Sequence, residues 1–391
     1  MSKLKKVISS VYVIAIAIAT LWTVHSYREM MRPGKKWENS GIDALERHDV
    51  KAAKDDWLLG TKLDPTYVAN YQRLGDLGLA LKDMPGAGHF LSQAVAISPQ
   101  SIDTDIKASK VNMALNNYPM AQKDAQAAID HGGDSAAAEE LLGEAAAKQN
   151  ISLVALRAMK QAYLMSPQTS DYLLGYVSVL IDSEKTDEAQ RLLQTYLALH
   201  HKDEYANFML SVILEKKPPT TENLNEILAH DMVALSHNDK KIEYWNLLGE
   251  TYLRLGQMKP ANMAYGHAYL LNKTSESALQ GLVASFNALR DKPHADEAAS
   301  RLNSVIALHE KIDQFQFIMQ QNPHNVGVGV QLAKLKESDN KVKTAEEMYT
   351  TLVQDNPTDK RARTAAEDFF IRTHRPDQAH LIATYDPKNN H

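Results

Sequence analysis

The sequence has no cysteine among its 391 residues. Without thiolates the chain cannot form disulfides, CxxC redox pairs, iron–sulfur clusters, cysteine-ligated zinc sites or thioether-linked haem. It also has no excess of basic residues, because 43 Lys and Arg stand against 48 Asp and Glu and give a formal net charge of −5. A chain with this charge has no overall positive field to concentrate nucleic acid, so we expect no nucleic-acid partner.

Glycine, proline and aromatic residues are sparse, at 17 Gly, 14 Pro and 7% aromatic. Hydrophobic residues make up 44% of the chain and charged residues 23%. This composition excludes a collagen-like chain and a fully disordered one, and it is typical of globular proteins.

One long hydrophobic run is present, directly after a basic N-terminal tail at residues 1–6. Residues 7–24 carry no charge, and a helix of that length spans roughly 27 Å, close to the hydrocarbon thickness of a bilayer. Trp22 lies near the far end of the run, where amphipathic rings favour the headgroup region. We therefore expect residues 7–24 to form a transmembrane signal-anchor helix in the membrane, followed by a juxtamembrane linker at residues 25–35.

A cleaved secretory signal is the alternative, because Ala17–Ala19 resembles an A-x-A cleavage site. The apolar run continues past that site to Val24, which favours the uncleaved anchor. Basic residues flank the run on both sides, so the positive-inside rule decides little. The short basic tail favours a single-pass protein with its bulk on the extracytoplasmic, periplasmic side, and the cytoplasmic-facing orientation stays open.

Prolines recur with a period of about 34 residues, seen from Pro65 to Pro99 and again from Pro323 to Pro357. Each of these follows an apolar stretch, where a residue that cannot continue a helix ends it. A second set of prolines, such as Pro85, precedes alanine-containing runs, where the fixed φ of proline suits a first helical turn. The spacing predicts a repeated pair of helices.

Large and small residues also recur at fixed offsets within the period. The offsets are seen in residues 66–101 as Tyr71, Leu74, Gly75, Ala87 and Leu91, and in residues 242–275 as Trp245, Leu248, Gly249, Ala261 and Tyr265. We expect the glycines and alanines to let paired helices approach, and the large residues to fill the groove between units. The pattern resembles the tetratricopeptide repeat, a helix–turn–helix of about 34 residues.

This resemblance implies an all-α fold, a right-handed α-solenoid of tetratricopeptide helix–turn–helix repeats preceded by the one N-terminal transmembrane helix. About seven repeats are expected in residues 36–275. Residues 276–325 are expected to form an irregular repeat with a lengthened helix, because the period breaks there. Residues 326–386 then hold the C-terminal repeats, and residues 387–391 form a tail.

No catalytic motif is complete in this sequence. His309 and Glu310 begin like the zinc motif HExxH, but Asp313 stands where the second histidine is required. No phosphate-binding GxxxxGK[ST] loop occurs. We therefore expect no enzyme activity, no catalytic residues, no cofactor, no metal and no small-molecule substrate.

The resemblance implies that a protein partner binds the concave face of the solenoid, which the first helix of each repeat lines. A basic group and an apolar group of residues are candidates for this contact. The candidates are Arg73, Lys107 and Lys110, and the apolar patch Leu174, Ile181, Tyr205, Phe208 and Val212. The alternative for the patch is packing inside the solenoid, since apolar residues at helical spacing usually belong to a core. The alternative for the basic group is a solvated surface.

The functional prediction is a non-enzymatic, membrane-tethered scaffold for protein–protein interactions, in the assembly, export or maturation of envelope or membrane protein complexes. The alternative is a constitutive structural subunit of a membrane enzyme or electron-transfer complex. A third possibility, a soluble secreted binding module, requires cleavage after Ala19.

Overall fold

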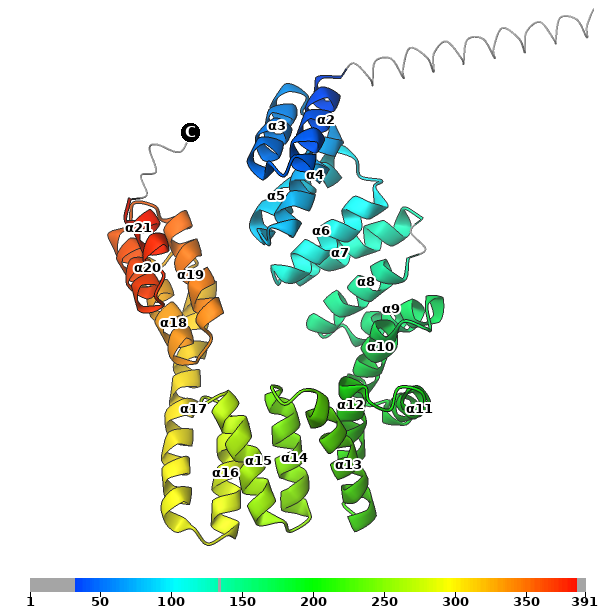
Figure 1. Cartoon of the computed structure of the whole chain (residues 1–391), viewed down its shortest axis with the longest axis vertical. Helices are drawn as coiled ribbons and strands as arrows, with labels where there is room; N and C mark the ends of the chain where they lie inside the picture. The colour runs from blue at the N-terminus through cyan, green and yellow to red at the C-terminus, as the bar shows by residue number, and fades with distance from the viewer. Residues whose placement is uncertain (1–31, 133–134, 385–391) are drawn as a thin grey trace, which may run out of the picture. The chain divides into compact units, whose positions relative to one another are not determined.

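The structure is a computed structural model that describes residues 32–132 and 135–384. These residues form twenty helices and no strand (Figure 1). The expected transmembrane helix at residues 7–24 and the tail at residues 387–391 lie outside the described residues. Within the described residues, none of the helices combines the length and the apolar character that crossing a bilayer requires.

The chain divides into two compact units between Leu192 and Leu193. The first unit contains α2 (Pro33–Glu46), α3 (Val50–Leu63), α4 (Val68–Ala80), α5 (Met84–Ile97), α6 (Ile102–Ala114), α7 (Tyr118–Asp130), α8 (Ala136–Lys148), α9 (Ser152–Met165) and α10 (Ser170–Asp182). Helix α11 (Thr186–Leu197) crosses the division.

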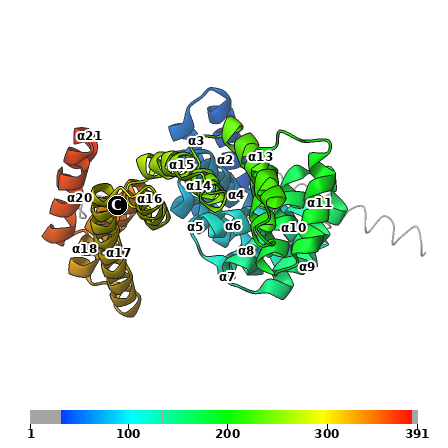
Figure 2. The ribbon, with the colours of Figure 1, turned by 90° about the horizontal axis from the view of Figure 1, so that it is seen from below.

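The second unit continues from α11 to the last described helix. It contains α12 (Glu204–Glu215), α13 (Thr221–His237), α14 (Ile242–Arg254), α15 (Met258–Leu271), α16 (Glu276–Ala288), α17 (Lys292–Gln321), α18 (Val326–Ser338), α19 (Val342–Asp355), α20 (Lys360–Arg372) and α21 (Pro376–Thr384). Consecutive helices pack against one another from α2 to α10 and again from α12 to α21, as Figures 1 and 2 show for α14, α15 and α16.

The helices follow the period of the sequence closely. The first helices of successive pairs begin at one constant interval, at Val68, Ile102, Ala136, Ser170 and Glu204. The period then lengthens twice, because α13 has 17 residues and α17 has 30, whereas α15 has 14. Helix α17, the longest of those described, lies inside the segment where the sequence predicts a lengthened helix.

Proline and aspartate set the helix ends. Helices α3 and α5 stop at Leu63 and Ile97, two residues before Pro65 and Pro99. Asp83 caps the start of α5, just after the end of α4, because its carboxylate accepts a hydrogen bond from the Gly86 amide at 3.0 Å. The local sequence thus ends one helix and starts the next within a few residues.

Glycine in a first helix admits a large side chain from the second helix. At Gly75 an added Cβ would lie 2.6 Å from Cγ of Leu91, and at Gly249 it would lie 2.8 Å from the ring of Tyr265. Both large side chains are buried. Close helix packing of this kind fills the core without cavities.

Trp245 differs from its sequence-based expectation as a groove-filling residue. Its neighbour Tyr244 is the buried aromatic, with 3% of its surface exposed. The Trp245 indole is half-buried, donates a hydrogen bond to the Asp239 carbonyl at 2.7 Å and stacks on His267 at 4.4 Å. A single position along a helix turns a side chain by about 100°, which is enough to exchange the inner for the outer face.

Candidate functional site

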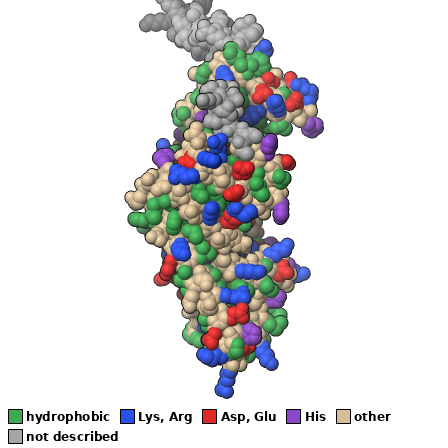
Figure 3. All heavy atoms as spheres, turned by 90° about the vertical axis from the view of Figure 1, so that its left-hand side faces the viewer, with side chains coloured by type: hydrophobic (Ala, Val, Ile, Leu, Met, Phe, Trp, Pro, Cys, Tyr) green, Lys and Arg blue, Asp and Glu red, His purple; other side chains and the backbone are tan. Residues whose placement is uncertain are grey.

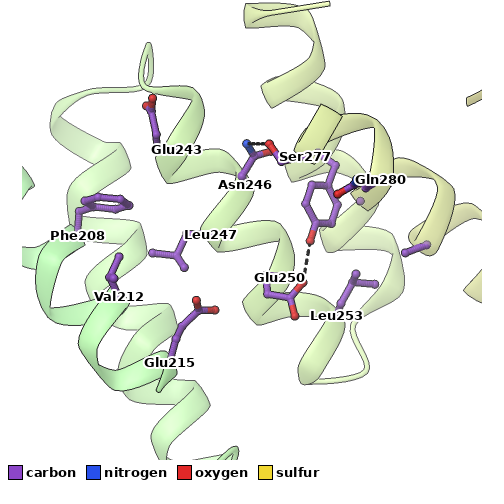
Figure 4. A pocket seen from close by; sticks show the side chains of 13 residues that line it. Phe208, Val212, Glu215, Glu243, Asn246, Leu247, Glu250, Leu253, Ser277 and Gln280 are labelled. Carbon is purple, nitrogen blue, oxygen red and sulfur yellow. Dashed lines mark hydrogen bonds between the residues drawn. The ribbon is translucent and has the colours of Figure 1, made fainter. Parts of the chain in front are cut away.

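A pocket of about 560 Å³ lies among the first helices of three successive pairs in the second unit (Figure 4). We call it the α12–α16 pocket, because residues of α12, α14 and α16 form most of its wall. Its lining consists of Phe208, Val212, Glu215, Glu243, Asn246, Leu247, Glu250, Leu253, Tyr265, Ser277, Gln280, Gly281 and Ala284.

One wall of the pocket is apolar. Phe208 and Val212 are one helical turn apart on α12, and Leu247 of α14 lies next to them (Figure 4). The Phe208 ring contacts Tyr244 at 4.7 Å between ring centroids and Tyr205 at 6.3 Å. These contacts hold the Phe208 ring while its edge remains at the pocket, so the wall can accept an apolar side chain.

Carboxylates lie at both ends of this wall. Glu243 is at one end, and Glu215 and Glu250 are at the other (Figure 4). Burial raises the pKa of Glu215, the nearby charge of Glu250 raises it further, and Arg254, whose Nη1 is 3.6 Å from Oε1, acts in the opposite direction. Glu250 accepts a hydrogen bond from the Tyr265 hydroxyl at 3.2 Å.

The third side of the pocket is polar and fixed. Asn246 donates a hydrogen bond through Nδ2 to the Ser277 hydroxyl at 2.9 Å, which ties α14 to α16 (Figure 4). Its Oδ1 is buried and has no hydrogen-bond partner among the described residues. At Gly281 an added Cβ would lie 2.2 Å from the Tyr265 ring, so only glycine leaves room for that ring beside Glu250.

The predicted apolar patch has members in both units, with Leu174 and Ile181 on α10 of the first and Tyr205, Phe208 and Val212 on α12 of the second. Leu174 is buried on α10, with 8% of its surface exposed, and Ile181 on the same helix is half-buried. Phe208 and Val212 meet in the α12–α16 pocket, and Tyr205, 43% exposed, stacks against Phe208 outside its lining. The pocket is therefore built around two of the predicted residues.

The three predicted basic residues differ in the ion pairs that they form. Arg73 lies 3.4 Å from Oε1 of Glu38. Lys107 pairs with Asp76 at 2.7 Å and with Asp103 at 2.8 Å, so its charge is balanced within the first unit. Lys110 is exposed and forms no ion pair with a described residue. Arg73 also lines a second pocket of about 590 Å³, on α2, α3 and α4 of the first unit, whose wall includes Trp57 and Leu77.

The acidic members of the α12–α16 pocket are absent from the sequence-based prediction. A usable signal existed, because the separation of Val212 and Glu250 along the chain equals that between the starts of α12 and α14. Equivalent positions in consecutive first helices face the same side, so aligning the pairs by their own period brings Glu250 next to Val212.

In the part of the chain that the structure describes, no group of three or more His, Asp or Glu side chains is arranged to hold a metal ion. His309, from the incomplete zinc motif, instead bonds the carboxylates of Glu276 and Asp339. On the face drawn in Figure 3, acidic and basic side chains are interspersed with apolar ones.

Neither a family model nor a curated protein matches the sequence. Solved structures do match. The fold resembles a tetratricopeptide repeat protein from Parabacteroides merdae, with a TM-score of 0.50 and 12% identity over 65% of this chain and 99% of that one. Pseudomonas aeruginosa PilF gives a TM-score of 0.46 and 15% identity over 56% and 96%. YrrB, a repeat protein with an unusual peptide-binding site, gives 0.38 and 17% over 49% and 96%. At these identities the similarity concerns the fold alone.

Proposed function

Because the chain has the tetratricopeptide repeat fold, we propose that it is a non-enzymatic scaffold that binds a protein partner through the first helices of its repeats. The observation that carries this proposal is the α12–α16 pocket, which three consecutive first helices share. An apolar wall with a fixed aromatic ring is the kind of surface that anchors a segment of another protein.

Phe208 is the residue on which to test this proposal. We expect Phe208→Glu to abolish co-purification of the partner with the full chain, because a buried charge in the apolar wall opposes insertion of an apolar side chain. Met263→Glu is the matched control, since Met263 is 66% exposed on the second helix α15 and lies outside the pocket lining. Circular dichroism checks that both variants stay folded. Equal partner recovery with both variants would reject the proposal.

We further propose that residues 7–24 tether the scaffold to a membrane, with the repeats on the extracytoplasmic side. The support is the length and apolar character of that run in the sequence. Protease added to cells with a permeabilised outer membrane should digest the repeats while a cytoplasmic protein remains intact. Protection until lysis would reverse the orientation, and an intact mass that corresponds to cleavage after Ala19 would replace the tether by a secreted module.

The process that such a scaffold serves is the assembly, export or maturation of envelope or membrane protein complexes. Stoichiometry separates this role from that of a constitutive subunit in a membrane enzyme or electron-transfer complex. A scaffold is recovered with less than one partner per chain and releases it, whereas a structural subunit is recovered at a fixed ratio.

A further inference from the structure

The α12–α16 pocket has an unbalanced charge. Its lining includes Glu215, Glu243 and Glu250 and contains no Lys or Arg. Arg254 forms an ion pair with Glu215, and the 3.6 Å between Arg254 Nη1 and Glu215 Oε1 is longer than a hydrogen bond. Glu243 is exposed and forms no ion pair with a described residue.

The carboxylates also keep unused hydrogen-bonding capacity. Oε1 of Glu215 is buried and has no hydrogen-bond partner among the described residues. Glu250 receives one hydrogen bond, from Tyr265. A carboxylate can accept about four hydrogen bonds, so both groups can take further donors.

The environment makes an approaching cation favourable. Burial raises the pKa of Glu215 and the neighbouring Glu250 adds to it, and the charge of Arg254 offsets only part of this, so further positive charge would favour the charged carboxylate. A guanidinium or ammonium between Glu215 and Glu250 would reduce both the desolvation cost and the repulsion between the two carboxylates. An anionic segment would be repelled by both carboxylates.

The apolar wall lies immediately beside these carboxylates. Val212 is one turn from Glu215 on α12, and Leu247 is one turn from Glu250 on α14 (Figure 4). A partner segment can therefore place an apolar side chain against the wall while an adjacent basic side chain reaches the acidic end. The two requirements together define a recognisable class of segment.

We propose that the α12–α16 pocket binds a partner segment that carries an arginine or lysine next to an apolar residue, with the cationic head between Glu215 and Glu250 and the apolar side chain against Phe208, Val212 and Leu247. This proposal rests on the proposed scaffold function and specifies the chemistry of its partner.

Three peptides that differ at one position test the proposal. Each has a central residue between two leucines, with glycine and serine at both ends, and the central residue is arginine, citrulline or glutamate. Citrulline keeps the shape of arginine without its charge. The full chain in a non-ionic detergent is titrated with each peptide to about 5 mM, a range that detects weak affinities. Methyl NMR signals of Val212 and Leu247 report on the pocket, and that of Leu153, 85% exposed on α9, reports on unspecific binding.

We expect the arginine peptide to shift the Val212 and Leu247 signals and to bind about tenfold more tightly than the citrulline peptide. The glutamate peptide should not bind. The tenfold advantage should disappear in the double variant Glu215→Gln with Glu250→Gln and should persist in the control Glu222→Gln, an exposed residue at the start of α13. Raising the salt concentration from about 0.05 to 0.3 M should reduce the advantage.

Equal affinities for arginine and citrulline, a preference unchanged in the double variant, or no signal shift with arginine at the highest concentration would each overturn the proposal. These results would leave the scaffold function intact if Phe208→Glu still abolished recovery of the native partner. The opposite result is also informative. If the peptides bind with the expected charge dependence but Phe208→Glu does not reduce recovery of the native partner, the pocket chemistry is supported and the pocket is rejected as the docking site of that partner.

Discussion

Asp231 is a carboxylic acid in the interior of the second unit, with 2% of its surface exposed. Its Oδ2 accepts a hydrogen bond from Thr251 at 3.0 Å, and its Oδ1 has no hydrogen-bond partner among the described residues. Burial raises the pKa of Asp231 from 3.8 to about 7. The folded chain therefore holds this proton more tightly than the unfolded chain does.

The raised pKa fixes the sign of a pH effect. Between pH 3.8 and about 7 the folded state binds more protons at Asp231, so this residue makes the free energy of unfolding fall as the pH rises through that window. Asp231→Asn removes the charge, and we expect it to stabilise the chain by about 2 kcal/mol at pH 8 and to have little effect near pH 4. Urea denaturation at the two pH values measures this. Asp55→Asn, an exposed counterpart, should show no such difference.

The turns inside the helix pairs place non-glycine residues in the left-handed region. The strained residue follows the end of the first helix by two positions in every pair except α12–α13, as at Asn116 with φ 57° and Glu184 with φ 60°. Among the turns inside the described pairs, the one after α14 uses glycine, at Gly256 with φ 73°. A left-handed conformation costs most residues about 1 kcal/mol, and asparagine tolerates it better.

Glu184→Gly should therefore raise the free energy of unfolding by about 0.5–1 kcal/mol, because glycine carries no Cβ to clash in this conformation. Asn116→Gly should raise the free energy of unfolding by less, because asparagine tolerates the left-handed conformation better. Thermal melts of both variants beside the parent chain measure the difference. A stabilisation of equal size in the two variants, or a loss at Glu184, would show that the turn conformation is not what limits stability there.

At the scale of helices, His309 joins three elements. It lies midway along α17, its Nε2 is 2.8 Å from Oδ1 of Asp339 at the end of α18, and its Nδ1 bonds Glu276 in the first turn of α16. Burial disfavours the charged imidazole, but the hydrogen bonds and negative charges of the two carboxylates outweigh it, so the pKa of His309 is raised above 6.5.

The raised pKa of His309 gives a pH effect of the same sign as at Asp231, because in both cases the folded state holds the proton more tightly; the protonated form is charged at His309 and neutral at Asp231. The stabilisation from charged His309 is complete below pH 6.5 and is lost as the pH rises through its folded-state pKa. His309→Gln should lower the free energy of unfolding of α17–α18 by about 1 kcal/mol at pH 6 and by less at pH 9. Hydrogen exchange of the α18 amides measures it. The same loss at both pH values, or an equal pH dependence in the control His324→Gln, would contradict this account.

Helices were the most predictable level of this structure, for a local reason. Proline cannot continue a helix, so Pro65, Pro99 and Pro357 indicate helix ends from the sequence alone, and each helix stops two residues earlier. Side-chain placement needs tertiary contacts as well. The exchange of Trp245 for Tyr244 in the core and the burial of Leu174 depend on the neighbouring helices, which the motif does not encode.

The candidate site was predictable only in part. Phe208 and Val212 follow from helical spacing, because apolar residues four apart share a helix face. Aligning the helix pairs by their own period also places Glu250 next to Val212, but the burial that raises the pKa of Glu215 depends on the folded surroundings. The charge of these carboxylates distinguishes the α12–α16 pocket from an ordinary apolar contact.

At the scale of the whole chain, stability is divided among local cores. Helices α18–α21 have a core of their own, in which Tyr349 and Phe369 are fully buried with ring centroids 4.9 Å apart. Helices α2–α4 have another core, around Trp57. In a repeat array each helix pair is stabilised mainly by the adjacent pairs, so the loss of stability caused by a core substitution should stay local.

Phe369→Ala should cost about 3–5 kcal/mol within α18–α21 and should remove hydrogen-exchange protection there, while α4–α9 keep theirs. Trp57→Ala should produce the reverse pattern, with loss confined to α2–α4. Exchange followed peptide by peptide in both variants makes the comparison. A uniform loss of protection along the chain would instead mean that the array unfolds as one cooperative unit.

The length of α17 limits how long a bound segment can be. With 30 residues, α17 carries α16 along its first half and α18 along its second, and the two short helices meet end to end at His309. Within the second unit the row of first helices α12, α14 and α16 therefore stops at α16. Three helices about 10 Å apart offer roughly 20 Å, which an extended segment of about six residues covers. Trimming a longer partner segment to that length should leave its affinity for the α12–α16 pocket unchanged.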